Sequence, residues 1–243
     1  MANHFNFQLI VCVNMKIGII ADIHSNFHAF NEVLSKLSNI DKIICAGDLV
    51  GYNAYPNEVI KIVQEKKIPC TLGNHDKAVV TQDTSWFNPI AAEAISWTVD
   101  HITKENLNYL SNLPIVFKEQ LNEYLLYVVH GSPRSPVEEY IFPDVSDQLL
   151  KEFLEETQAD ILVMGHTHVP FIRKIGKSFV INPGAVGQPR DYDSRASCIV
   201  LNVESEKIKI EHIRVKYNIA EAAKAIEKVG LPPMLAQRLY FGW

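Results

Sequence analysis

Short apolar runs alternate with amphipathic stretches along most of the chain from residue 15 onward. Six runs have strand length: "KIGIIA", "KIICA", "PCTL", "LLYVVH", "DILVM" and "SFVIN". Between them, "HAFNEVLSKLSNI" places Phe30, Val33, Leu34 and Leu37 at the spacing of one buried helix face, and "NEVIKIVQEKK" repeats this spacing. Strands that alternate with crossover helices predict an α/β fold.

Capping residues add further helices to this pattern. In "FNPIAAEAISWTVDHIT", Asn88 is a suitable N-cap and Pro89 suits the first helical position, so a helix is predicted as far as about Thr103. "SDQLLKEFLEETQ" predicts another helix. The tail, residues 217–243, reads as a helix that ends at Gly230 and a short amphipathic helix after it, and we expect both to pack on the same domain.

Domain organisation follows from the same pattern. The regular pattern begins at Met15, so residues 1–14 are predicted to be a poorly ordered N-terminal extension. Residues 15–216 are predicted to form the main domain, because no repeat, low-complexity segment or linker interrupts them. With 243 residues, 47% of them hydrophobic, the chain can bury a sizeable core. The pattern does not determine the oligomeric state.

Charge and cysteine content narrow the possible partners and location. A net charge of -5 gives no general attraction to polyanions, so nucleic acid is an unlikely partner and a phosphate needs a local site. The four cysteines form no CxxC pair and are read as reduced thiols, which predicts a cytoplasmic protein. No apolar stretch approaches the roughly 18 residues of a membrane span, and the first residues lack an export pattern.

Polar clusters follow almost every predicted strand. They are Asp22-Ile-His24, Gly47-Asp48, Gly73-Asn74-His75-Asp76, His130-Gly131 and Gly165-His166-Thr167-His168. Turns favour some of these residue types in any protein, but five clusters rich in metal-ligand types, without Lys or Arg, exceed what turns require. Because ligands of open α/β sheets bind beyond the carboxyl ends of the strands, the clusters are expected to converge on one site.

The residue types in these clusters point to metal ions. Residues two apart in an extended segment point to the same side, so Asp22 with His24, and His166 with His168, are each expected to face one pocket. Oxygen and nitrogen donors without thiolate suit Mn, Fe, Zn or Ni. Seven candidate ligands exceed the needs of one ion. They fit two ions about 3.5–4 Å apart that share a carboxylate, an arrangement that promotes phosphoryl hydrolysis.

Taken in order, D-x-H, G-D, G-N-H-D, H-G and G-H-T-H resemble the motifs of the calcineurin-like metallophosphoesterase superfamily, over roughly residues 15–214. The resemblance implies a four-layer α/β/β/α sandwich of two mixed β-sheets flanked by helices, with a dinuclear metal centre at the strand ends. It also implies the ligands: Asp22, His24 and His168 for the first ion, Asn74, His130 and His166 for the second, and Asp48 as the bridge.

The resemblance further implies how catalysis would proceed. A hydroxide held between the two ions would attack phosphorus, and His75 would protonate the leaving oxygen. Asp76 is expected either to orient His75 through a hydrogen bond or to be an ordinary turn carboxylate.

Four residues outside the motifs are candidates for substrate binding. Arg190 lies in "NPGAVGQPRDYD", where glycines and prolines predict a rigid segment, and it is expected to hold a phosphate. Arg134 is a weaker candidate with surface charge as its alternative. Tyr52 and Asn53 follow the bridging aspartate and either line the site or are plain loop residues.

Several members of the superfamily do not match the sequence. The Ser/Thr phosphatases continue the second motif as G-D-x-V-D-R-G, whereas this chain has "GDLVGYN". DNA-repair nucleases add regions for which a short acidic chain has little room. The compact prokaryotic phosphodiesterases and phosphatases remain, which predicts hydrolysis of a small phosphate diester or monoester, with diesters preferred.

Two alternatives to an enzyme stay open. One is a non-catalytic scaffold like the retromer subunit, whose pattern departs at the histidine that matches His75. The other is a regulator that binds a nucleotide without turnover.

Overall fold

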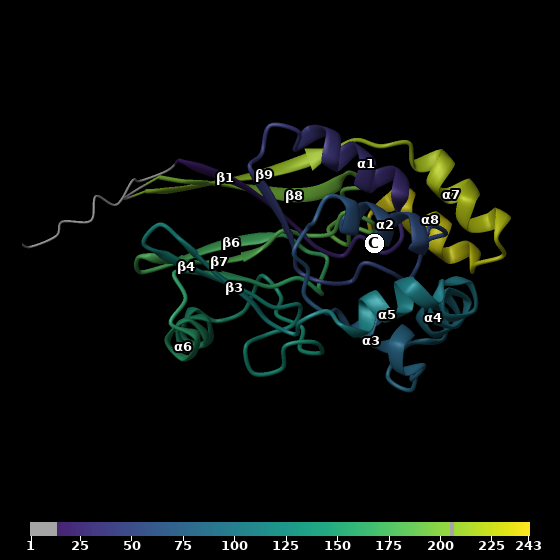
Figure 1. Cartoon of the computed structure of the whole chain (residues 1–243), viewed down its shortest axis with the longest axis horizontal. Helices are drawn as coiled ribbons and strands as arrows, with labels where there is room; N and C mark the ends of the chain where they lie inside the picture. The colour runs from purple at the N-terminus through teal and green to yellow at the C-terminus, as the bar shows by residue number, and fades with distance from the viewer. Residues whose placement is uncertain (1–13, 205–206) are drawn as a thin grey trace, which may run out of the picture.

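Two β-sheets lie face to face in the computed structural model, which describes residues 14–204 and 207–243 (Figure 1). In the first sheet the order is β2 (Lys42–Cys45), β1 (Met15–Ile20), β8 (Ala196–Val203) and β9 (Ile208–Val215). In the second it is β3 (Phe117–Leu121), β4 (Tyr124–Val128), β5 (Ile161–Val163), β7 (Ser178–Asn182) and β6 (Phe171–Ile175).

Each sheet is mixed. In the first, β1 pairs with β2 in parallel and with β8 antiparallel, and in the second β5 is parallel to both β4 and β7. Helices lie on the outer side of each sheet (Figure 1). The α/β class and the four-layer architecture are therefore confirmed. The predicted extension, residues 1–14, lies outside the described residues except for its last one.

The helices begin and end as follows: α1 (Phe27–Lys36), α2 (Pro56–Glu65), α3 (Asn74–Thr81), α4 (Pro89–His101), α5 (Lys104–Ser111), α6 (Asp147–Thr157), α7 (Ile219–Lys228) and α8 (Pro233–Phe241). As expected, Asn88 caps α4, and its side chain accepts a hydrogen bond from the Ala91 amide. Across the described ranges, no helix is long and apolar enough to cross a membrane.

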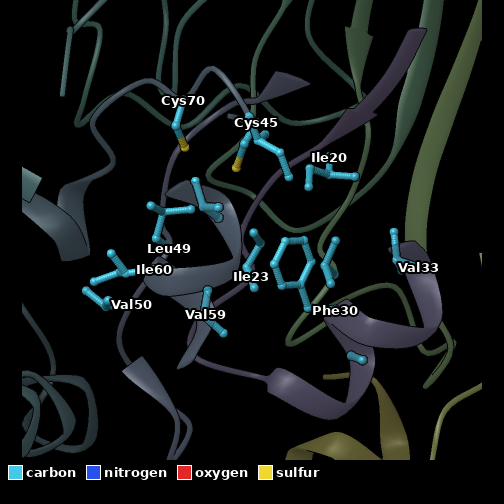
Figure 2. Close-up of a cluster of buried hydrophobic side chains, with 14 of the residues drawn as sticks. Ile20, Ile23, Phe30, Val33, Cys45, Leu49, Val50, Val59, Ile60 and Cys70 are labelled. Carbon is cyan, nitrogen blue, oxygen red and sulfur yellow. The ribbon is translucent and has the colours of Figure 1, made fainter. Parts of the chain in front are cut away.

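Alternating side chains of β1 contribute to two of the buried clusters. Ile17 and Ile19 of β1 point toward the second sheet and pack there with residues such as Val163. Ile20 points the other way, into a second cluster with Phe30 of α1 and Ile60 of α2 (Figure 2). Full burial of such a side chain stabilises the fold by about 1.5–3 kcal/mol. These two buried clusters fix the strand ends from which the polar clusters emerge.

The run "PCTL" does not form the predicted strand. Only Cys70 makes a bridge, to Cys45, and the amide of Leu72 instead donates a hydrogen bond to the carbonyl of Pro114. The strands β3, β6, β8 and β9 and the helices α3 and α5 were not predicted from the pattern.

The C-terminal helices pack against α4. Leu235 and Leu239 of α8 share a buried cluster with Ala91 and Ala94 of α4 and with Tyr52, which lies next to the polar clusters. The chain therefore returns to the edge of the site at its C-terminus, as Figure 1 shows.

Candidate metal centre

Loops that follow β1, β2, β4 and β5 bring the polar clusters together. The backbone of these loops is left-handed at five of the candidate ligands, with φ of 54° at Asp22, 47° at His24, 55° at Asp48, 70° at His166 and 61° at His168. Asp and His tolerate this conformation better than most residues, but each instance costs about 1 kcal/mol. The expectation of an extended segment with same-side alternation is therefore wrong. The residues converge because the loops turn sharply beyond the strand ends.

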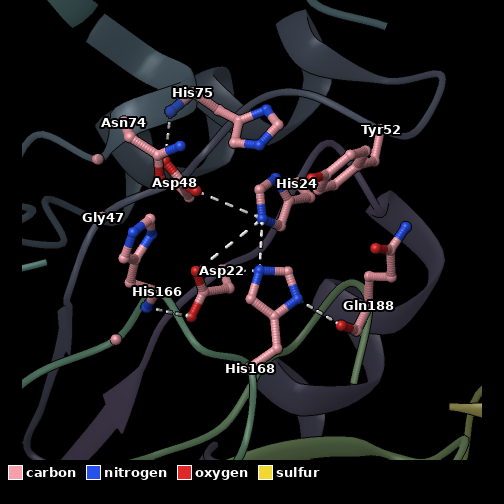
Figure 3. A network of polar contacts seen from close by, with 12 residues as sticks. Asp22, His24, Gly47, Asp48, Tyr52, Asn74, His75, His166, His168 and Gln188 are labelled. Atoms are coloured by element: carbon pink, nitrogen blue, oxygen red, sulfur yellow. Dashed lines mark hydrogen bonds and ion pairs between the residues drawn. The ribbon is translucent and has the colours of Figure 1, made fainter. Parts of the chain in front are cut away.

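The first group consists of Asp22, His24, Asp48 and His168, whose candidate ligand atoms all lie within 4.8 Å of one another. The Nε2 atoms of His24 and His168 are 3.0 Å apart (Figure 3). Asp22 Oδ1 lies 3.5 Å from His168 Nε2 and has no hydrogen-bond partner, although it is buried.

The two imidazoles of this group direct lone pairs at each other. His24 Nδ1 faces the carbonyl of Val50 at 2.9 Å, and His168 Nδ1 faces that of Gln188 at 2.5 Å. Because a carbonyl only accepts, each Nδ1 carries the proton and each Nε2 is bare. Burial also lowers the pKa of both histidines well below the usual value. Two bare nitrogens at 3.0 Å, beside an unpartnered carboxylate oxygen, fit a cation between them.

The second group consists of Asp48, His130 and His166, with Asn74 beside it. His130 Nε2 lies 3.1 Å from His166 Nδ1 and 3.0 Å from Asn74 Oδ1. His130 Nδ1 donates to the carbonyl of Ala46, and His166 Nε2 faces that of Glu138. Each ring is again held from behind, so that its other nitrogen faces the group.

Asp48 belongs to both groups. Its Oδ2 lies 3.4 Å from His24 Nε2 and 3.4 Å from His130 Nε2. Of the candidate ligands in these two groups, Asp48 is therefore the one that faces both.

The buried charges of the protein also favour a cation here. Burial raises the pKa of Asp22 to about 8, and the nearby Asp48 adds to that shift. For His130, burial acts to lower the pKa, but Asp48, Asp22 and the hydrogen bond to Ala46 together outweigh burial and raise the pKa to about 10. A divalent ion at Asp48 therefore competes with the His130 proton and would release it on binding.

Asn74, His75 and Asp76 form the first turn of α3, which the sequence pattern did not predict. The amide of His75 donates to Asp48 Oδ1 at 2.9 Å. Its ring is buried between Tyr52 and Phe87, at centroid distances of 4.4 and 5.0 Å, and its Nδ1 has no hydrogen-bond partner.

Asp76 does not orient His75 in the structure. Its Oδ1 accepts hydrogen bonds from the amides of Leu49 and Val50, and its Oδ2 accepts one from Gly73. Of the two alternatives for Asp76, the hydrogen bond to the His75 ring is therefore wrong. Asp76 instead ties the start of α3 to the loop that carries Asp48, since one carboxylate satisfies three amides that would otherwise be unpaired.

Of the candidate substrate-binding residues, Arg190 and Tyr52 lie at the site. Both line a pocket of about 240 Å³ together with His75, and Arg190 donates a hydrogen bond to the Tyr52 hydroxyl at 3.0 Å. Asn53 is buried and donates to the carbonyl of His24 at 2.8 Å, so it supports the ligand loop.

Arg134 lies away from the candidate ligands. Its guanidinium is bound to Glu152 and Glu156 of α6. The surface alternative is therefore correct for Arg134, because two carboxylates on one helix face compensate its charge.

Residues that the sequence did not single out line the same region. Trp86, Phe87 and Tyr140 border both the pocket with Arg190 and a neighbouring pocket of about 470 Å³ that reaches Asn74 and His166. Tyr140 stacks on His166 at a centroid distance of 3.7 Å. Arg238 and Trp243, from the C-terminus, complete the smaller pocket. No motif marks these residues, since they come from loops and from the far end of the chain.

The two-sheet α/β sandwich gathers Asp and His residues beyond its strand ends into two groups that could each hold a metal ion. Residues 15–206 match the family model of the calcineurin-like phosphoesterase superfamily domain. The chain belongs to this superfamily, as the order of its motifs predicts.

Individual relatives agree with this assignment. A protein of Methanocaldococcus jannaschii, named as uncharacterised, is 37% identical over 95% of this chain and 99% of its own length. The crystal structure of a metallophosphoesterase from Sphaerobacter thermophilus is 33% identical, with a TM-score of 0.81 over 95% of this chain and 100% of that chain. A zinc-complexed Vps29 from Entamoeba histolytica, 16% identical over 82% of this chain and 99% of that chain, shares the fold with a TM-score of 0.50.

Gly73 is not a candidate ligand, but replacing it by Ala is expected to displace the carboxylate of Asp48. A Cβ atom at Gly73 would lie 2.0 Å from Asp48 Oδ1 and 2.3 Å from the Asp48 amide nitrogen, so the carboxylate has to move. Overpacking of this kind costs about 1–3 kcal/mol. We expect the melting temperature to fall by roughly 2–12 °C and bound metal to decrease, measured by calorimetry and elemental analysis.

The control is Gly176→Ala, where φ of +62° strains the backbone of an alanine but the added methyl group meets no atom within 4 Å. It should keep its metal content. Full metal content in Gly73→Ala would contradict the close packing of Gly73 on Asp48.

Proposed function

We propose that this chain hydrolyses a phosphate ester of a small molecule with two divalent ions bound at the candidate centre. The observation that carries the proposal is the position of Asp48 Oδ2, 3.4 Å from one imidazole of each group. The proposed ligands are Asp22, His24, His168 and Asp48 for one ion and Asn74, His130, His166 and Asp48 for the other.

Two divalent ions would supply a nucleophile at neutral pH and would neutralise charge on the phosphoryl group. Oxygen and nitrogen donors suit Mn, Fe, Zn or Ni, and the cellular supply of these metals decides among them. The backbone carbonyls behind His24 and His168 fix the orientation of the rings before any ion binds.

His75 is proposed as the proton donor to the leaving oxygen. It lies beside the two groups, and its ring lines the pocket that also contains Arg190. Burial lowers the pKa of His75 to about 4. A phosphate anion in the pocket would act in the opposite direction and favour the protonated ring.

Arg190 is proposed to bind the substrate phosphate, with Tyr52 holding the guanidinium in place. Arg190 lies 5.6 Å above the Tyr52 ring and donates to its hydroxyl. A preference for diesters and a cytoplasmic location remain predictions from the sequence.

The direct test is an assay of protein loaded separately with Mn and Ni. We expect turnover of an aryl phosphate diester, an aryl phosphate monoester or both, and none from the same preparation after chelation. Absence of turnover with every metal and ester would contradict the proposed hydrolysis and favour the scaffold or regulator alternatives.

Removing the metal is also expected to lower stability. Ions present at 100 to 1,000 times their Kd stabilise the fold by about 2.7–4.1 kcal/mol. For a chain of this size, chelation with EDTA should therefore lower the melting temperature by roughly 5–15 °C. The shift should reverse when Mn is added back, and a melting temperature insensitive to EDTA would contradict a metal site in the folded protein.

A further inference from the structure

Arginine side chains in the described part of the chain fall into two sets. Four are ion-paired with carboxylates: Arg134, Arg173, Arg195 and Arg214. Arg190 and Arg238 have no carboxylate within salt-bridge distance among the described residues, and both line the pocket of about 240 Å³ next to His75. The uncompensated guanidinium groups of the chain are therefore gathered in one pocket.

Neutral groups hold both guanidiniums. Arg190 bonds to the Tyr52 hydroxyl and, at 3.4 Å, to Gln188 Oε1. Arg238 lies 5.6 Å from the centre of the Trp243 ring, and its Nε is buried without a hydrogen-bond partner. Burial and the positive charge of Arg190 both lower the pKa of Arg238. The two arginines repel each other and neither has a salt bridge among the described residues, so an anionic group bound in this pocket reduces the repulsion and accepts their hydrogen bonds.

The C-terminus is fixed in this position by the loop that carries Arg190. The amide of Tyr192 donates to the carbonyl of Gly242 at 2.7 Å. Gly242 packs so closely on Asp193 that a Cβ atom there would lie 2.8 Å from the Asp193 backbone. Arg238 and Trp243 are thus held beside Arg190 by the backbone.

The pocket of the two arginines is separate from the candidate ligands. His75 borders it, but none of the seven proposed metal ligands does, whereas Asn74 and His166 border the larger neighbouring pocket. Arg190 is close enough to affect the charges of Asp22 and His168. An anion at Arg238 would therefore occupy the pocket that His75 borders, which none of the candidate ligands lines.

We infer that Arg238 forms a subsite for a second phosphate group, next to the phosphate that Arg190 is proposed to bind, so that the substrate is an ester whose non-reacting part carries its own phosphate. This inference rests on the proposed function, since the first phosphate is assigned to the metal centre. Arg238 has the role of a specificity-determining residue supplied by the C-terminal helix. A guanidinium suits this role because its planar N–H groups bind a phosphate through two hydrogen bonds.

The test compares two non-hydrolysable ligands, propylene bisphosphonate and propylphosphonate, by calorimetry on the metal-loaded protein. The wild type should bind the bisphosphonate about tenfold or more tightly, since a hydrogen bond to a charged group typically contributes that much. Arg238→Gln should lower this preference about tenfold, and Arg238→Lys should keep part of it because it keeps the charge. The matched control, Arg134→Gln, removes an arginine outside the site and should leave the preference intact.

The outcomes separate this inference from the proposed function. Equal binding of the two ligands by the wild type, or an undiminished preference in Arg238→Gln with an unchanged melting temperature, overturns the subsite. Binding of neither ligand overturns both proposals. A preference that depends on Arg238, in a protein that hydrolyses no ester, supports the subsite and contradicts hydrolysis.

Discussion

Asp48→Asn is expected to lower the bound content of both metal ions together and to lower kcat/KM by about a hundredfold or more. Mutation of residues that only support a metal ligand already lowers metal affinity or activity by roughly 10–100-fold. Asp48 Oδ2 faces both His24 and His130, so removing its charge affects both groups. Asparagine keeps the oxygen that accepts a hydrogen bond from the His75 amide, which preserves the local backbone. The measurements are metal content by elemental analysis and turnover of an aryl phosphate.

The matched control for this variant is Asp100→Asn, the same chemical change at an exposed position on α4. It should bind metal and turn over substrate like the wild type. Loss of one ion alone in Asp48→Asn would show that Asp48 serves a single ion, and retention of both would remove it from the centre.

His75→Ala is expected to lower kcat by about 10²–10⁴ for an ester with a poor leaving group, while both ions stay bound. The effect should be smaller with p-nitrophenyl phosphate, because p-nitrophenolate leaves without protonation. The ring of His75 lies beside the two groups and is not one of the clustered metal-ligand candidates. Steady-state kinetics with an alkyl and an aryl ester, together with metal analysis, measure the difference.

His101→Ala serves as the control, since His101 is an exposed histidine that stacks on Trp97. Equal kcat in His75→Ala and the wild type for the alkyl ester would exclude His75 as the proton donor. An equal loss for both esters would indicate a binding role for the ring instead.

Strong local signals made much of the fold predictable. Apolar runs gave β1, β2, β4, β5 and β7, and the N-cap at Asn88 gave the start of α4. The pattern missed strands such as β9, in which the alternation of apolar and charged residues breaks at His212. It also missed α3, because the N-cap of that helix is Gly73, which offers no capping side chain.

The sequence predicted which residues form the candidate site, but it did not predict their geometry. Motif order indicated the residues that the structure brings together, from Asp22 to His168. The left-handed backbone of these loops depends on tertiary contacts and has no local sequence signal that alternation can detect. The sequence left two alternatives open for Asp76 and for Arg134, because adjacency in sequence says little about which amides or carboxylates a side chain reaches in space. Arg238 lies more than two hundred residues from Asp22, and only the packing of α8 brings it near.

The pairing of β1 with β8 has a consequence for biosynthesis. β1 carries Asp22 and His24 at its end, yet one of its two neighbours in the sheet is the strand Ala196–Val203. Before that strand leaves the ribosome, β1 has only β2 beside it, and two strands alone are marginally stable. A nascent chain therefore presents these candidate metal ligands without the scaffold that orders them, and the candidate centre can assemble only after the strand Ala196–Val203 has emerged.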